Sequence, residues 1–160
     1  REKEVFLADP GMQPQLEKYE YMVGRQLRPE ARTDIVFDLE ERKVKPSSMI
    51  DISDGLASDL LHISKSSHVG VRIFEDKIPI DTQAYETAVE FKLDPITCGL
   101  NGGEDYELLF TITQGDYEKI KNHPDVHFIG YIHENVSQNI MITKQENVIP
   151  LRAQGWDHFK

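Results

Sequence analysis

Residues 49–61, which read MIDISDGLASDLL, are the stretch around which the fold predicted from this sequence is organised. Apolar and partly β-branched side chains at positions 49, 50 and 52 predict a short strand. The chain then breaks at Ser-Asp-Gly, and from Leu56 onward leucine and isoleucine recur at spacings of four and three, which is one face of a helix. The sequence therefore predicts a strand that passes through a tight turn into a helix.

The predicted turn places Asp51 and Asp54 on either side of the Ser53 hydroxyl. Ser53 or Asp54 is a candidate N-cap, because its oxygen can accept a hydrogen bond from an unpaired N–H of the first helical turn. Three oxygen ligands at the positive end of a helix also suit a hard cation and a phosphate that the cation bridges. Taken alone, the turn favours the cap over the metal site. His62 is left out of the site, since a lone histidine is more often a surface or core residue than a ligand.

A second stretch changes this balance. Residues 101–110, NGGEDYELLF, set two glycines and two acids before the start of a strand. Together, DISDGL at 51–56 and GGEDYEL at 102–108 resemble the C-terminal domain of thiamine-monophosphate kinase. GWDHF at 155–159 is similar to that family's closing segment, and RQLRPEAR at 25–32 to its arginine- and proline-bearing connection. The resemblance extends over nearly the whole chain in the same order.

The resemblance implies an α/β/α sandwich with a mixed sheet, like the C-terminal domain of aminoimidazole ribonucleotide synthetase. It also implies that residues 1–160 are the C-terminal domain of a longer enzyme, with an ATP-binding domain upstream. Residues 1–7 read as the tail of a helix, which agrees with that expectation. The 160 residues alone are then expected to be inactive, and the longer enzyme to form a homodimer through the upstream domain.

The family transfers the γ-phosphoryl group of ATP to thiamine monophosphate and produces thiamine diphosphate. By the matching positions, Asp51 and Asp54 would bind Mg²⁺ and Ser53 would contact the nucleotide. Glu104 and Trp156 would contact thiamine monophosphate. The motifs supply acids rather than a nucleophile, as expected for a reaction between two anions that depends on metals and positioning.

Two other functions remain open. One is another ATP-dependent reaction of the same superfamily, such as that of aminoimidazole ribonucleotide or selenophosphate synthetase. The other is a non-catalytic module that binds thiamine phosphates. The stretch GEDYEL at 103–108 favours the thiamine-monophosphate kinase reaction over the first, and the intact acids argue against the second.

Composition restricts the class of protein. The chain has 18 lysine and arginine residues against 28 acids, a formal net charge of −10, which argues against a nucleic-acid-binding surface. No apolar run approaches the roughly 20 residues that a membrane helix needs. Cys98 is the only cysteine, so no intrachain disulfide can form, and a reducing cytoplasm is the expected location. We expect Cys98 to be a small buried apolar residue.

The rest of the chain is predicted from its apolar periodicity. Helices are expected over 14–27, 31–41, 82–91, 94–101 and 115–122, and strands over 69–74, 106–113, 126–132, 139–143 and 148–151. The expected inward residues of the first three helices are Leu16, Tyr19, Met22, Val23, Leu27, Ile35, Val36, Leu39, Tyr85, Ala88 and Val89, with Phe91 a further candidate. We expect 126–132 and 139–143 to pair with each other and 106–113 to be a central strand. This pattern independently indicates a layered α/β domain with a mixed sheet.

Arg25, Arg28 and Arg32 allow two interpretations. They could form a cluster that faces phosphate groups. They could instead solvate helix ends and pair with Glu30 or Asp34, which is at least as common for surface arginines.

Overall fold

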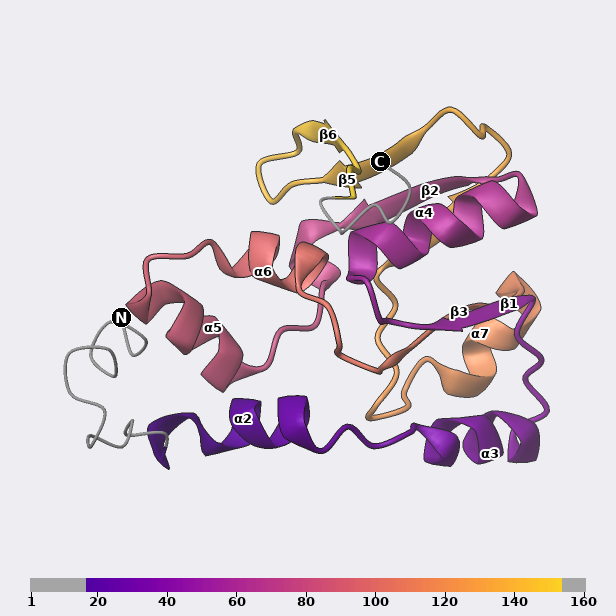
Figure 1. Cartoon of the computed structure of the whole chain (residues 1–160). Coiled ribbons are helices and arrows are strands. Elements are labelled where there is room, and N and C mark those ends of the chain that lie inside the picture. Colours follow the sequence, from indigo (N-terminus) through magenta and orange to yellow (C-terminus); the bar gives the residue numbers. More distant parts are fainter. Residues whose placement is uncertain (1–16, 154–160) are drawn as a thin grey trace.

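The computed structural model describes residues 17–153 (Figure 1). Its helices are η1 (Glu17–Tyr19), α2 (Glu20–Leu27), α3 (Thr33–Glu41), α4 (Leu56–Ser67), η2 (Glu75–Lys77), α5 (Thr82–Glu90), α6 (Pro95–Asn101) and α7 (Gln114–Ile120). Its strands are β1 (Ser48–Asp51), β2 (Gly70–Phe74), β3 (Leu108–Thr111), β4 (Gly130–His133), β5 (Asn139–Ile142) and β6 (Val148–Pro150). The predicted elements within these residues are present, with ends that differ by a few positions.

The described strands form two sheets. β1 pairs antiparallel with β3, from Ser48 opposite Thr111 to Asp51 opposite Leu108. The other sheet has the order β4-β2-β5-β6, in which β2 is parallel to β5 and antiparallel to β4. This sheet is therefore mixed, and with the helices around it the predicted mixed α/β class is confirmed.

Two predictions about strand pairing are wrong. The segments predicted to pair with each other, 126–132 and 139–143, contribute β4 and β5, which lie on opposite sides of β2. In this interior position of β2, Val71 and Ile73 are each only 1% exposed. The segment predicted to be a central strand forms β3, which pairs with β1 alone among the described strands.

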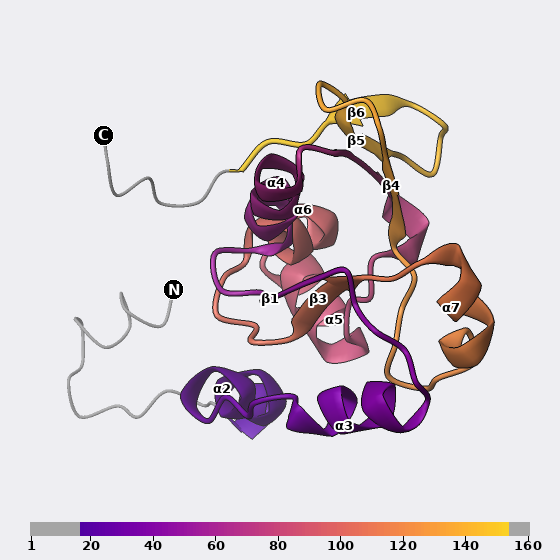
Figure 2. The same cartoon turned by 90° about the vertical axis from the view of Figure 1, so that its right-hand side faces the viewer.

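Two hydrophobic cores lie on either side of β3. The first is built mainly on α4 and β2, and it includes Leu109. The second contains buried residues of α3 and α7, and Leu108 and Phe110 pack against it. Because successive side chains of a strand point to opposite faces, β3 contributes to both cores. Figures 1 and 2 show the β1–β3 pair between α4 on one side and α3 on the other.

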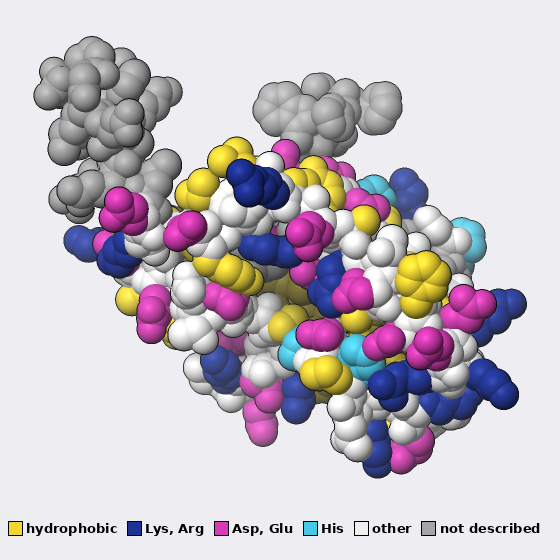
Figure 3. Space-filling view, turned by 90° about the horizontal axis from the view of Figure 1, so that it is seen from below, with side chains coloured by type: hydrophobic (Ala, Val, Ile, Leu, Met, Phe, Trp, Pro, Cys, Tyr) yellow, Lys and Arg dark blue, Asp and Glu magenta, His cyan; other side chains and the backbone are white. Residues whose placement is uncertain are grey.

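The helices bury less than their periodicity predicts. In α3, Ile35 and Leu39 are buried as expected. α5 buries Ala88 alone, and no residue of α2 is buried. The predicted inward residues that are exposed are Leu27, Val36, Tyr85, Val89 and Phe91, and Leu16 lies outside the described residues. Figure 3, which views the molecule from the side of α2 and α3, shows charged side chains of both signs among hydrophobic ones.

Cys98 is exposed, so the prediction of a buried residue is wrong. The reason is that α6, in which it lies, buries none of its residues. Between residues 17 and 153, no helix has both the length and the apolar character needed to cross a membrane.

Candidate functional site

The two motif loops lie side by side. Their backbones continue the β1–β3 pairing, since Ile52 N–H donates to the Glu107 carbonyl at 2.8 Å and Tyr106 N–H donates to the Ile52 carbonyl at 2.9 Å. Glu104 N–H donates to the Ser53 carbonyl at 2.9 Å. Residues about fifty positions apart in the sequence therefore meet at the N-terminus of α4.

This contact brings together four of the five predicted site residues. Asp51, Asp54 and Glu104 are exposed, and Ser53 is half-buried. Trp156 lies outside the described residues. The acids predicted to bind a metal and the acid predicted to bind substrate are thus on neighbouring loops at one end of the β1–β3 pair.

Close approach of the two loops depends on glycine. Gly55 has a φ of 101°, and a Cβ there would lie 3.1 Å from backbone atoms of Asn101 and Gly102. A Cβ on Gly103 would lie 2.7 Å from the Ser53 carbonyl oxygen. No other residue type fits these two positions without moving one loop away from the other.

The interpretation of Ser53 or Asp54 as a helix cap is wrong. The N-cap of α4 is Gly55, and no side chain caps the helix there. The sequence alone favoured a helix cap over a metal site at this turn. Because neither Ser53 nor Asp54 caps α4, that preference no longer applies. The exposed carboxylates of Asp51 and Asp54 are compatible with ligand binding.

Asp59, which sequence reasoning missed, ties the turn before the helix to α4. It is 1% exposed, and its Oδ2 accepts hydrogen bonds from Ser53 N–H at 3.1 Å and Asp54 N–H at 3.3 Å. Burial raises the pKa of the Asp59 carboxyl, and the two hydrogen bonds oppose that rise. His62, excluded at first, also lies here: Asp54, Asp59 and His62 each place one potential ligand atom within 4.8 Å of the others.

The second loop is held by residues of α2 and by Arg32, which precedes α3. Glu107 accepts hydrogen bonds from Arg25 at 2.6 Å and from Arg32 at 2.5 Å. The side chain of Gln26 donates to the carboxylate of Glu104. Desolvation and the neighbouring charge of Glu107 raise the pKa of Asp105, and Arg25 opposes that rise.

Arg25 and Arg32 therefore match the second interpretation better than the first, with Glu107 as their shared partner. Arg32 pairs with Asp34 at 3.0 Å as well as with Glu107, and the hydrogen bonds to these two acids raise its pKa. Arg25 is similarly committed to Glu107. Both side chains are engaged by acids of the chain rather than directed to an open phosphate site.

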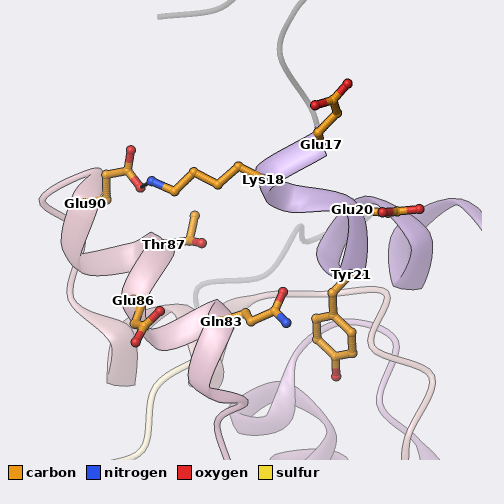
Figure 4. Close-up of a pocket in the computed structure, with 8 residues that line it drawn as sticks. All are labelled: Glu17, Lys18, Glu20, Tyr21, Gln83, Glu86, Thr87 and Glu90. Atoms are coloured by element: carbon orange, nitrogen blue, oxygen red, sulfur yellow. Dashed lines mark hydrogen bonds and ion pairs between the residues drawn. The ribbon is translucent and has the colours of Figure 1, made fainter.

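A separate hollow of about 690 Å³ lies between η1, α2 and α5 (Figure 4). It is lined by Glu17, Lys18, Glu20, Tyr21, Gln83, Glu86, Thr87 and Glu90. Lys18 forms an ion pair with Glu90 across it. None of the predicted site residues lines this hollow, so it is distinct from the candidate site.

Comparison with known proteins agrees with the motifs. No family model matches the chain. A thiamine-monophosphate kinase of Pyrococcus horikoshii is 38% identical over 114 residues, which is 71% of this chain and 34% of that protein. One of Aquifex aeolicus is 33% identical over 150 residues, 90% of this chain and 45% of that protein. The chain spans less than half the length of the curated relatives it matches.

Solved structures give the same result. AaThiL complexed with AMPPCP and TMP matches with a TM-score of 0.74 at 29% identity, covering 98% of this chain and 46% of that one. Thiamine-monophosphate kinase of Stenotrophomonas maltophilia matches with a TM-score of 0.67 at 28% identity, covering 84% and 42%. The hydrogenase maturation protein HypE, at 17% identity and a TM-score of 0.59, covers 79% and 42% and shows the fold alone. The predicted resemblance and fold class are confirmed.

Proposed function

Because this chain is related in sequence and in fold to the thiamine-monophosphate kinases, we propose that it supplies part of an enzyme that transfers the γ-phosphoryl group of ATP to thiamine monophosphate. The main support is the contact between the two motif loops, which gathers Asp51, Ser53, Asp54 and Glu104 at the N-terminus of α4. The products would be thiamine diphosphate and ADP.

The donor set fits Mg²⁺. Asp51 and Asp54 offer exposed carboxylate oxygens, which are the ligands that this hard cation prefers. When bound, Mg²⁺ would offset the negative charge of the phosphates. Asp51 and Asp54 would hold the cation, and the Ser53 hydroxyl would orient the nucleotide beside them. The positive end of α4 would add to the attraction for phosphate.

Glu104 and Trp156 are proposed to contact thiamine monophosphate. Glu104 has a φ of 64°, so its backbone lies in the left-handed region, which is costly for a residue other than glycine. The hydrogen bond from Glu104 N–H to the Ser53 carbonyl stabilises that conformation, and it holds Glu104 next to the loop that contains Ser53 and Asp54. This arrangement supports a reaction that depends on positioning rather than on a protein nucleophile.

Other features of the proposed enzyme stay predictions. A homodimer through an upstream domain and a cytoplasmic location follow from the resemblance and from the single cysteine. Another ATP-dependent reaction of the superfamily, such as that of aminoimidazole ribonucleotide or selenophosphate synthetase, stays the second candidate function. A panel of acceptors that includes thiamine monophosphate separates these two functions.

Substitution of the acids in the complete natural protein tests the proposal. Asp51→Asn and Asp54→Asn keep the side-chain size but remove the charge. We expect kcat for thiamine diphosphate formation to fall by about 100-fold or more, because losing a phosphate-bridging metal costs several kcal/mol of transition-state stabilisation. Asp76→Asn, which changes an exposed acid of η2, is the matched control and should leave kcat unchanged.

The measurement is a titration with Mg²⁺, with a thermal melt of each variant. Near-normal turnover of Asp51→Asn or Asp54→Asn at limiting Mg²⁺ would contradict the metal role. A complete protein that phosphorylates some other acceptor, and not thiamine monophosphate, would contradict the proposed substrate.

A further inference from the structure

Asp59 is a buried carboxylate at a position where the helix period predicts an apolar side chain. It lies three residues after Leu56 and next to Leu60, both of the first core, and it is 1% exposed. A carboxylate removed from water to this degree is costly unless its oxygens are hydrogen bonded. The compensation comes from the Ser53 and Asp54 N–H groups, at 3.1 and 3.3 Å from the same oxygen.

These two hydrogen bonds act on the nucleotide and metal loop itself. Both N–H groups belong to the turn that precedes the N-cap Gly55, so α4 itself gives them no partner. Asp59 supplies their acceptor from within α4. Because both N–H groups donate to one oxygen, the backbone at Ser53 and Asp54 is held relative to the helix.

We propose that Asp59 is a positioning residue, which holds Ser53 and Asp54 in the conformation that binds nucleotide and cation and touches neither ligand itself. The proposal rests on the proposed function. Burial separates the two roles: Asp59 is inaccessible, whereas Asp54 and His62, the other members of its cluster, are exposed. The Oδ2 of Asp59 is also occupied by two donors.

Two substitutions in the complete natural protein distinguish hydrogen bonding from charge. Asp59→Asn keeps an acceptor oxygen and loses the charge, whereas Asp59→Leu has a similar size and accepts nothing. Ser64→Ala is the control: Ser64 is also buried in α4, 3% exposed, but it donates to the Val69 carbonyl at 2.6 Å and to Asn139, far from the loop.

The first readout does not depend on activity. Amide hydrogen exchange at Ser53 and Asp54 should be about tenfold faster in Asp59→Leu than in the wild type, because a hydrogen bond to a charged group is worth about 1.5 kcal/mol, or about a factor of ten. Asp59→Asn should stay within about threefold of the wild type. Ser64→Ala should lower the melting temperature without changing exchange at these two amides.

The second readout is turnover against Mg²⁺ concentration, at a temperature where every variant is folded. Asp59→Leu should lower kcat by about tenfold and raise the Mg²⁺ requirement, whereas Asp59→Asn should stay within about threefold of the wild type. Equal, near-complete loss of turnover in both variants with wild-type exchange would overturn the proposal in favour of a direct ligand. Unchanged turnover in Asp59→Leu would reduce Asp59 to a stabilising residue.

If the wild-type protein does not phosphorylate thiamine monophosphate, the proposed function fails. The exchange measurement then decides whether Asp59 positions the loop. Faster exchange at Ser53 and Asp54 in Asp59→Leu, but not in Asp59→Asn, supports the positioning role, and unchanged exchange in Asp59→Leu overturns it.

Discussion

At the scale of single residues, the site depends on where a side chain is absent as much as on the acids. Gly55 combines a φ of 101° with backbone atoms 3.1 Å from the position of a Cβ. Both features exclude an L side chain, the first through the cost of the conformation and the second through contact with rigid backbone. The acids of the neighbouring loop can lie beside the Asp51–Asp54 turn only because this position is glycine.

We expect Gly55→Ala to destabilise the protein by about 2–3 kcal/mol, because backbone strain adds to the displacement of the second loop. Gly24→Ala is the matched control. Gly24 lies within α2, and a Cβ there would have nothing within 4 Å, so alanine should stabilise by up to about 1 kcal/mol. Urea unfolding of both variants measures the difference. A neutral Gly55→Ala would show that the loops do not need this close approach.

The sequence identified most of the candidate site but not the residue that holds it. Asp51, Ser53, Asp54 and Glu104 were found because they stand in two short motifs. Asp59 was missed because helical periodicity only says which face a residue occupies. Side chains of a helix lean toward its N-terminus, so an acid one turn inside a helix can reach back to N–H groups of the turn that precedes the helix. An acid one turn after a predicted helix start is therefore a sequence signal for a residue that holds the preceding turn.

At the scale of elements, local chemistry predicted where helices begin better than which faces they bury. α6 begins as predicted after Asp94, whose carboxylate accepts from Thr97 N–H at 2.8 Å and from the Thr97 hydroxyl at 2.6 Å. Strand partners are set by tertiary packing instead, and the position of β2 between β4 and β5 has no local signal. The apolar side of α5 is likewise exposed because too little of the chain covers it.

The Asp94 cap gives a prediction with a defined pH dependence. The hydrogen bonds from Thr97 hold the pKa of Asp94 below its usual value. A folded-state pKa below the unfolded one means that the stabilisation is complete above the unfolded pKa of about 4, and that it is lost as the pH falls through the folded pKa. Asp94→Ala should therefore cost about 1 kcal/mol at neutral pH, and the difference from the wild type should shrink in acid.

Thermal melts between neutral and acidic pH measure this cap. Asp94→Asn keeps an acceptor without a charge, so its difference from the wild type should be smaller at neutral pH than that of Asp94→Ala. A constant loss for Asp94→Ala across the whole pH range would contradict a contribution from the ionised carboxylate.

At the scale of the whole molecule, α2 is held largely by polar contacts. Neither core contains a buried residue of α2, and no residue of that helix is buried. Polar contacts supply much of its attachment to the site: Gln26 to Glu104, and Arg25 to Glu107. Glu107 also accepts from Arg32, so one carboxylate connects the start of the described chain, the segment before α3 and the second motif loop.

We therefore expect Glu107→Gln to loosen residues 20–32 without unfolding either core. The glutamine keeps the size of the side chain but removes the charge on which both arginine contacts depend, and half-exposed contacts of this kind contribute about 0.5–1 kcal/mol each. Amide exchange and proteolysis within 20–32 should both become faster, and the effect should decrease at high salt because salt already weakens the ion pairs of the wild type. Glu118→Gln, which removes an exposed pair with Lys121 on α7, is the control and should change neither rate. If Glu107→Gln behaves like this control, apolar contacts rather than Glu107 hold α2 beside the site.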